Sequence, residues 1–460
     1  MELAKVKADL QTAREAIDRA EAGLADEPLV PLEVWHWGTE TKDSAYPREQ
    51  ALADLKACGV TRNLWAANLL TEANRKAHVD AFGTLPGTLI AAVHLPMAAK
   101  LAAGHKGIPY AHVNDEVKGD GEVQASNAAL RDEFRVVVDN PGCVWGHGPW
   151  VLKERYGLEK YISVDVMSSW DFSYPNPYVP SCIYVSGQAA RMVSPKPGYL
   201  CVELIPDPSF GYNVLPPRDC VVRSAMYAAL CQPLALAFYG WWRVWNEPGA
   251  KETLKLAIDR ARAVHREIVG WERVKPDLAL VVSKSFYTTS AYWERSICVY
   301  QVAAACIRAG VRFDFVWEPE GAAAVMNYGH YCRFVGYDSY GAILSIDGTA
   351  LKLNKRMTWG RANMLGSTDH WRQDEAEAEA DKVPAALRAL GLWSYVQRGN
   401  VVHEIVQKDD RRKIVAANGA MDWPMGGGPF AGKSVALSQE VEMAGETRLM
   451  GPFEFEVVEV

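Results

Sequence analysis

The stretch from Val34 to Asn68 decides the fold: VWHWG (34–38), EQALADLKACG (49–59) and RNLWAAN (62–68). Two short runs rich in aromatic and apolar residues flank a segment whose apolar residues recur at helical spacing. A strand, a helix and a second strand in this order are typical of a parallel sheet, because the helix returns the chain to the start of the next strand. The stretch therefore predicts a parallel sheet with helices packed on its outside.

The same alternation continues over about 210 residues and gives eight predicted strands in all. The remaining six are TLIAAVHL (88–95), PYAHVNDE (109–116), CVWGHGP (143–149), ISVDVMSS (162–169), YLCVELI (199–205) and LALAFYGWW (234–242), with helices at 126–138, at 151–160 and from 218. Eight such units predict a (β/α)₈ TIM barrel, whose sites lie at the carboxyl ends of the strands. We assign CIYVSG (182–187) to an excursion between the sixth and seventh strands, with a ninth strand as the alternative.

The pattern changes at both ends of the barrel and predicts four domains. Residues 1–28 read as an amphipathic N-terminal helix, because apolar residues recur every three or four positions from Leu3 to Leu24. Residues 29–275 form the barrel, and at 276–385 strands and helices restart as a smaller α/β domain. Residues 386–460 alternate with period two, as in NVVHEIVQ, RKIVAAN and FEFEVVEV, which predicts a small antiparallel β domain.

Charge, cysteines and motifs exclude several classes of function. Forty-nine basic against 56 acidic residues give a net charge of −7, without the basic excess that nucleic-acid binding needs. The nine cysteines form no CxxC pair, so we expect reduced thiols and a cytoplasmic protein. We recognise no signal peptide, membrane span, phosphate-binding glycine loop or metal-ligand spacing, and therefore expect no membrane partner, no cofactor and no metal.

Two carboxylates follow or end predicted barrel strands. Glu203 lies in YLCVELIPDP with apolar neighbours on both sides, where an unpaired carboxylate would cost several kcal/mol. That position calls for a function or a firm partner, and Arg218 or Arg223 could form a structural ion pair with it. Glu116 ends AHVNDE in a more polar segment, where a solvated loop is an equal alternative.

Aromatic and polar residues gather at the same strand ends. Sugar rings have apolar faces edged by hydroxyls, so Trp platforms beside His and Asn donors suit a carbohydrate. The candidate sugar-binding residues are His36, Trp37, Asn68, His94, Asn114, His147, Trp170 and Trp241. Two carboxylates roughly 5 to 5.5 Å apart define a retaining glycosidase, and strands four and seven of a barrel could supply them.

The segment from Cys201 to Arg243, CVELIPDPSFGYNVLPPRDCVVRSAMYAALCQPLALAFYGWWR, resembles the seventh to eighth strands of the family 42 β-galactosidases of glycoside hydrolase clan A. The resemblance implies that Glu203 is the nucleophile. Two further segments resemble parts of those enzymes. NDEVKGDGEVQASNAALRDEF is similar to the loop and helix after their third strand, and LKERYGLEKY is similar to a helix after their fourth strand. Its members also follow the barrel with an amidotransferase-like trimerisation domain and a small β domain, so the resemblance implies a homo-oligomer, with a trimer as the family's form.

This sequence departs from the family at the acid/base, for which the family carries an Asn-Glu pair after strand four. If CVWGHGP is the fourth strand, His147, Gly148 and Pro149 replace the acid. If PYAHVNDE is the fourth strand, Glu116 is the acid, with Asp115 inserted after Asn114. Glu154 and Glu247 are alternatives. We expect a retaining exo-glycosidase acting on a β-linked sugar; the alternative is a catalytically inactive carbohydrate-binding or scaffold protein derived from such an enzyme.

Overall fold

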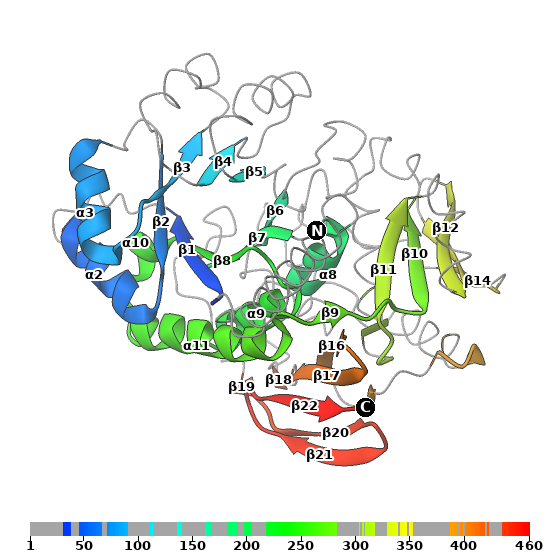
Figure 1. Ribbon diagram of the computed structural model, residues 1–460. Helices are drawn as coiled ribbons and strands as arrows, with labels where there is room; N and C mark the ends of the chain where they lie inside the picture. Colours follow the sequence, from blue (N-terminus) through cyan, green and yellow to red (C-terminus); the bar gives the residue numbers. More distant parts are fainter. Residues whose placement is uncertain are drawn as a thin grey trace, which may run out of the picture. The chain divides into compact units, whose positions relative to one another are not determined.

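Eight parallel strands pair in chain order, and the eighth pairs with the first to close a barrel (Figure 1). The strands are β1 (Glu33–Trp37), β2 (Arg62–Ala66), β3 (Gly87–Ile90), β4 (Tyr110–Val113), β5 (Val136–Asp139), β6 (Ile162–Val166), β7 (Pro197–Glu203) and β8 (Ala235–Tyr239). The computed structural model describes residues 31–37, 46–66, 71–90, 110–113, 136–139, 162–166, 182–191, 197–204, 218–282, 303, 306–307, 309–317, 329–338, 341–346, 349–352, 387, 389–392, 396–398, 401–418, 421–422 and 435–460. The predicted parallel sheet with helices is confirmed.

The described helices of the barrel follow or precede its strands. They are α2 (Arg48–Cys58), α3 (Glu72–Phe82), α8 (Cys182–Ala190), α9 (Arg218–Leu230), the short α10 (Trp241–Val244) and α11 (Ala250–Ile268). Thr71 caps α3 by accepting the backbone N–H of Asn74, and α2 ends at Gly59, whose φ of 104° suits a residue without a side chain. The long helix α11 buries one apolar face, from Leu254 through Ile258 to Ile268.

The predicted position of the fifth strand and the end of the predicted helix at 126–138 are wrong. The fifth strand is Val136–Asp139, within and just beyond the predicted helix 126–138; CVWGHGP (143–149) lies outside the described residues. Three successive β-branched valines favour a strand there. CIYVSG is the start of helix α8 and lies between β6 and β7, in the predicted excursion, and the alternative of a ninth strand is wrong. The sequence leaves both open because a short apolar run has no period that separates a buried helix from a buried strand.

Successive residues of the strands divide between two apolar layers. Trp35, Leu64, Tyr199, Cys201, Ala235 and Ala237 form a cluster inside the barrel. The alternate positions, such as Val34, Leu200 and Phe238, belong to the larger cluster that includes α9 and α11. The barrel therefore has a packed interior and a helical outer layer, so open space for a ligand must lie at an end of the barrel.

After the barrel the chain forms further sheets. One has the order β11 (Phe313–Trp317), β10 (Leu278–Val282), β12 (His330–Asp338), β13 (Gly341–Ile346) and β14 (Thr349–Lys352), with β10 parallel to β11 and β12. Another has the order β22 (Phe455–Glu459), β17 (Arg411–Asn418), β16 (Val401–Lys408) and β9 (Glu272–Arg273). A third has the order β15 (Val396–Arg398), β20 (Gln439–Met443) and β21 (Glu446–Met450), and β18 (Met421–Asp422) pairs with β19 (Val435–Ala436).

The four-stranded sheet that contains β16 and β17 and the three-stranded sheet that contains β20 share one apolar core. This core includes Val401, Ile405, Ile414, Val441 and Met443. Their antiparallel pairing gives the C-terminal part of the chain the layout of a small β-sandwich. Contacts join Leu32–Val460 into one compact unit. The four domain boundaries, the amidotransferase-like character of 276–385 and the homo-oligomer stay predictions, and the N-terminal helix lies outside the described residues.

Candidate functional site

The carboxyl ends of all eight strands lie at one rim of the barrel, because every pairing in it is parallel. The fourth strand in that order is Tyr110–Val113. Of the two competing alignments, the structure therefore supports the one in which PYAHVNDE supplies strand four and Asn114 follows its last residue. CVWGHGP is not the fourth strand.

Glu203 is the last residue of β7, at this rim. It lies in register with Tyr239, the last residue of β8, and Tyr239 lies in register with Trp37, the last residue of β1. These three positions thus form one layer at the carboxyl ends of three adjacent strands. Below them, Trp35 packs on Tyr199 with ring centroids 5.7 Å apart, so this layer forms the upper limit of the packed interior.

A chain of aromatic contacts joins the end of β8 to β1. Tyr239 meets Trp242 edge to face at 4.9 Å between ring centroids, and Trp242 meets His36 in the same way at 6.3 Å. Tyr239 and Trp242 are both partly exposed. Among the described residues these two rings are the apolar surface nearest in sequence and register to the Glu203 position, and a flat partly exposed ring is a suitable platform for a sugar.

His36 belongs to the outer layer and not to the barrel interior. It is fully buried, alternates with Trp35, and its Nδ1 lies 2.9 Å from the side-chain oxygen of Asn63. Burial lowers the pKa of His36 to about 4, against a smaller opposing effect of the Asn63 hydrogen bond. His36 is therefore neutral near pH 7. Its Nε2 atom has no hydrogen-bond partner within the described part of the chain.

Trp241 is also buried. Its side chain is 1% exposed, and its indole N–H donates to the hydroxyl of Tyr46 at 2.7 Å. Tyr46 in turn donates to Asp54 at 3.0 Å and stacks on Trp245. Trp241, the first residue of α10, thus packs in the protein interior. Its contact with a sugar stays a prediction.

The remaining predicted site residues divide into those with a position in the described structure and those outside it. For Trp37 and Glu203 the structure gives a strand position, and Asn68, His94, Asn114, Glu116, His147, Trp170 and Glu154 lie outside the described residues. Glu247 lies in the turn after α10 and is partly exposed. Arg223, proposed above as an ion-pair partner of Glu203, is buried in α9; Arg218 is the first residue of that helix.

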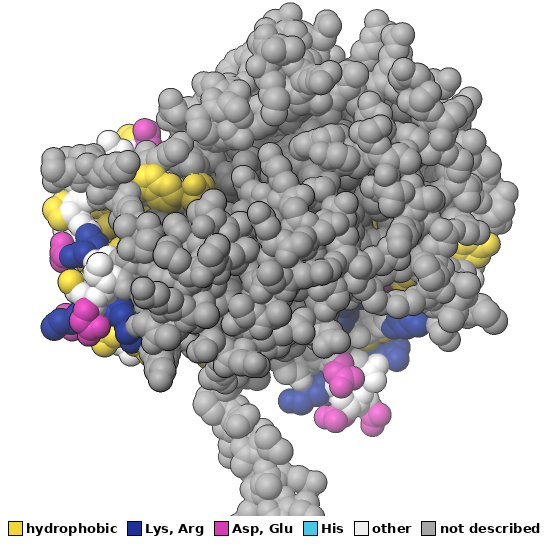
Figure 2. All heavy atoms as spheres, turned by 90° about the horizontal axis from the view of Figure 1, so that it is seen from above, with side chains coloured by type: hydrophobic (Ala, Val, Ile, Leu, Met, Phe, Trp, Pro, Cys, Tyr) yellow, Lys and Arg dark blue, Asp and Glu magenta, His cyan; other side chains and the backbone are white. Residues whose placement is uncertain are grey.

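A groove of about 580 Å³ lies elsewhere, between α2 and α3. It is lined by small residues such as Ala53 and Ala77 and by the charged residues Lys56, Lys76 and Asp80. Figure 2 shows basic, acidic and apolar side chains mixed over this part of the surface. None of the predicted site residues lines the groove, and its mixed charge indicates no particular ligand.

No group of three or more His, Cys, Asp and Glu side chains among the described residues is arranged to hold a metal ion. None of the helices in this part of the chain combines the length and the apolar character that crossing a membrane requires.

One buried carboxylate is not among the residues predicted from the sequence. Glu404, in VVHEIV of β16, is 1% exposed and contacts two arginines. Its signal is the one that singled out Glu203, an acidic residue with apolar neighbours on both sides in a strand. The partners of Glu404 lie in distant segments that the sequence does not connect to it.

Comparison with known proteins finds similar folds but no family. No family model and no curated protein matches the chain. Among solved structures, α-L-fucosidase isoenzyme 2 from Paenibacillus thiaminolyticus aligns at a TM-score of 0.56 and 8% identity, over 90% of this chain and 93% of that one. The β-galactosidase from Bacillus circulans sp. alkalophilus gives 0.53 and 10%, over 93% and 99%. A β-galactosidase from the Antarctic haloarchaeon Halorubrum lacusprofundi gives 0.52 and 10%, over 94% and 99%. The chain therefore has a fold like that of these glycoside hydrolases.

Proposed function

We propose that this protein is a retaining exo-glycosidase that hydrolyses a β-linked sugar, β-galactosidase-like in its specificity. The observation that carries the proposal is the position of Glu203, the last residue of β7, in one layer with Tyr239 and Trp37 at the carboxyl rim. Catalytic residues of barrel enzymes come from the ends of several strands at this rim.

Glu116 is the proposed acid/base. It follows Val113, the last residue of β4, by three positions, and three residues of extended chain span roughly 10 Å. In the proposed reaction the Glu203 carboxylate attacks the anomeric carbon while Glu116 protonates the leaving oxygen. Water, activated by Glu116 as base, then attacks the glycosyl carbon, breaks its bond to Glu203 and restores both carboxyl groups.

The two carboxyl groups need opposite protonation states before the first step. Glu203 must be ionised to attack, and Glu116 must hold a proton near neutral pH. A negative charge on Glu203 favours that difference, because it raises the pKa of a nearby carboxyl group. Asn114 and a partly exposed ring such as Tyr239 or Trp242 would hold the sugar between them.

Aryl β-glycosides with good leaving groups test the proposal. Glu203→Ala should abolish turnover of every such substrate, because no covalent intermediate can form. Glu116→Ala should retain the first step on activated substrates, and added azide should restore the second step and yield a glycosyl azide. Glu252→Gln, on the exposed side of α11, is the matched control and should act as wild type. No release of aryl alcohol by the wild-type protein from any β-glycoside would favour the carbohydrate-binding alternative instead.

A further inference from the structure

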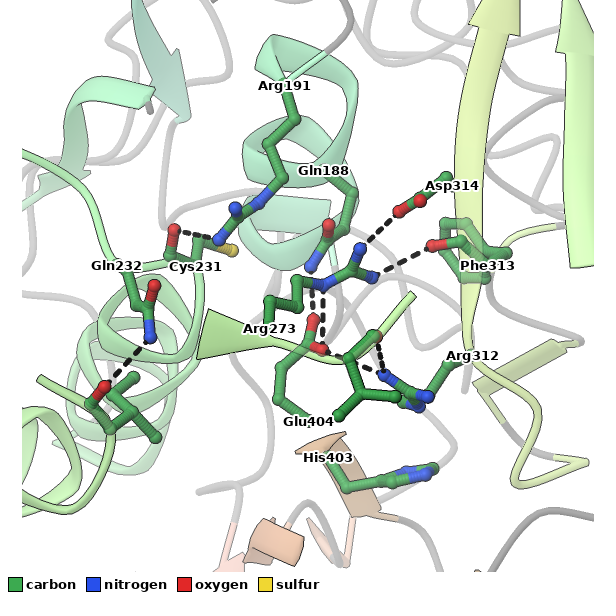
Figure 3. A network of polar contacts seen from close by, with 12 residues as sticks. Gln188, Arg191, Cys231, Gln232, Arg273, Arg312, Phe313, Asp314, His403 and Glu404 are labelled. Carbon is green, nitrogen blue, oxygen red and sulfur yellow. Dashed lines mark hydrogen bonds and ion pairs between the residues drawn. The ribbon is translucent and has the colours of Figure 1, made fainter. Parts of the chain in front are cut away.

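Glu404 of β16 is a buried carboxylate that contacts distant parts of the chain (Figure 3). Its Oε2 atom accepts a hydrogen bond from Nε of Arg273, in β9, at 2.8 Å. The same oxygen lies 3.6 Å from Nη1 of Arg312, which precedes β11. One oxygen of Glu404 therefore joins the C-terminal sandwich to the residues that follow α11 and to the start of a strand in the five-stranded sheet.

The other oxygen of Glu404 contacts a helix of the barrel. Oε1 accepts hydrogen bonds from the Tyr184 hydroxyl at 2.5 Å and from Nε2 of Gln188 at 2.6 Å. Both donors belong to α8, one turn apart, and both are buried. In Figure 3 Gln188 points from this helix toward Glu404. A single carboxylate thus holds one face of α8.

The cluster is balanced in charge. Arg273 also pairs with Asp314 and donates to the Phe313 carbonyl at 3.2 Å, and Arg312 donates to the Val274 carbonyl at 2.6 Å. Two guanidinium groups face two carboxylates, so no net charge is buried. Burial opposes ionisation of Glu404, but the guanidinium groups of Arg273 and Arg312 outweigh it and hold the pKa of Glu404 below its usual range. The contacts of Glu404 persist at neutral pH.

At Gly187 the helix α8 fits closely against β7 and Cys231. A Cβ atom at Gly187 would lie 2.4 Å from Sγ of Cys231 and 3.0 Å from Cδ1 of Leu200. Leu200 belongs to β7, three positions before Glu203. At the end of the helix, Arg191 donates to the Cys231 carbonyl at 2.5 Å. Because Gly187 leaves no gap, a shift of α8 would displace β7 or Cys231, the residue that follows α9.

We propose that Glu404 is a positioning residue for the carboxyl end of β7: it holds α8 against β7 and so fixes the strand that ends in Glu203. The contacts run from Glu404 through Gln188 and the neighbouring Gly187 to Leu200. A residue of the C-terminal sandwich would in this way set the geometry of the barrel rim. The expected effect on reaction rate rests on the proposed function. The expected effect on the position of β7 does not.

Two variants break the contact at different points. Glu404→Gln removes the charge that Arg273 and Arg312 face. Tyr184→Phe removes only the hydroxyl that donates to Glu404 and keeps the ring that meets Phe313 edge to face, so it serves if the first variant does not fold. Met443→Ala is the matched control, because Met443 lies in the core between the sandwich sheets. Its truncation should destabilise the sandwich and leave the side chains of the Glu404 cluster unchanged.

Hydrogen exchange of the backbone amides measures the coupling directly. In Tyr184→Phe or Glu404→Gln we expect exchange in α8 and at Leu200 to Glu203 to accelerate about tenfold, with β2 unchanged. Wild type and Met443→Ala are compared at temperatures that give the two proteins equal overall stability. The same amides of Met443→Ala should then exchange at rates within about threefold of the wild-type rates. Equal exchange at β7 in the cluster variants and in Met443→Ala would overturn the proposal.

Kinetics on an activated aryl glycoside give the second readout. Misplacing the end of β7 should lower kcat about tenfold and leave KM within about twofold, because the nucleophile is displaced and the sugar still binds. Met443→Ala should keep both constants when rates are given per folded molecule. If Glu203→Ala turned over like wild type, the proposed function would fail, and the exchange of the β7 amides would still decide whether Glu404 positions this strand.

Discussion

The indole N–H of Trp241 donates to the hydroxyl of Tyr46 at 2.7 Å, across 195 positions of the chain. Both side chains are about 1% exposed, and Tyr46 passes the interaction on by donating to Asp54. The end of β8 is therefore fastened to the residues that open α2. This contact ties the last unit of the barrel to its first and gives Trp241 a structural partner.

Trp241→Phe should therefore lower stability more than it alters sugar binding. The variant removes the hydrogen bond from Trp241 to the Tyr46 hydroxyl, which still donates to Asp54. The lost hydrogen bond together with the lost ring volume costs about 2 to 3 kcal/mol. Urea unfolding measures this loss, and the double variant with Tyr46→Phe should cost less than the sum of the two singles. A large rise in KM with unchanged stability would instead establish Trp241 as a sugar contact.

Acid should destabilise the protein through its buried neutral histidines. Burial lowers the pKa of His36 and of His78 from 6.5 to about 4. His78 accepts the backbone N–H of Asn63 with Nε2, and its Nδ1 lies 2.8 Å from the Thr84 carbonyl, so protonation would break an existing contact. Between pH 6.5 and about 4 these histidines are protonated in the unfolded chain but neutral in the folded chain. The free energy of unfolding therefore falls as the pH is lowered through this range.

Each of these histidines accounts for about 3 kcal/mol over that window, since one pKa unit corresponds to about 1.4 kcal/mol. Unfolding free energies at pH 7.5, 6 and 4.5 test this, with His36→Phe as the comparison. The variant lacks the His36 share of this loss and should therefore lose less stability per pH unit than wild type. An unchanged pH slope would show that His36 binds its proton equally well in the folded and unfolded states.

Asn418 should be the most sensitive polar residue of the sandwich. Its amide nitrogen donates to the Leu437 carbonyl at 2.9 Å and to the Gly451 carbonyl at 2.7 Å, while its oxygen accepts from Gln439 at 2.6 Å. Asn418→Leu keeps the branched shape of the side chain but removes these contacts at a buried position, at a cost of about 3 kcal/mol. Thermal unfolding measures it, and the exposed Thr447→Ala is the control. A midpoint equal to that of the control would contradict the assignment.

The sequence predicts the order of the barrel better than the bounds of its parts. β1, β2 and β8 have β-branched or aromatic residues beside helices of clear period, and their strands are confirmed. CIYVSG leaves a ninth strand open as an alternative because α8 is buried: it contacts β7 at Gly187 and Glu404 through Gln188. A helix buried all round has no polar face to show its period.

Sequence reasoning also reaches the position of Glu203 but not the cluster of Glu404. Glu203 needs only the rule that parallel strands end at one rim, which local pattern and chain order supply. Glu404 needs Arg273, Arg312 and Tyr184, which lie 131, 92 and 220 positions away. Such pairings depend on how the sheets pack, and no spacing along the chain encodes them.

Gly187→Ala should be among the most damaging small substitutions in the chain. The added methyl group would lie 2.4 Å from Sγ of Cys231 and 2.9 Å from its Cβ, inside van der Waals contact with a residue that is itself fully buried. Overpacking of this kind costs about 1 to 3 kcal/mol. The strain acts where α8 meets β7, so unfolding should show a lower midpoint.

Cys231→Ala separates the clash at Gly187 from any cost that the added methyl group has through the backbone. Cys231→Ala removes the sulfur but keeps Cβ, so the double variant with Gly187→Ala should recover part of the lost stability and not all of it. Gly83→Ala is the matched control, because no atom lies within 4 Å of its added Cβ while its φ is +72°. Any cost there comes from the backbone alone, about 1 to 2 kcal/mol, and Cys231→Ala should not relieve it. Strictly additive effects of Gly187→Ala and Cys231→Ala would contradict the direct contact between α8 and the end of α9.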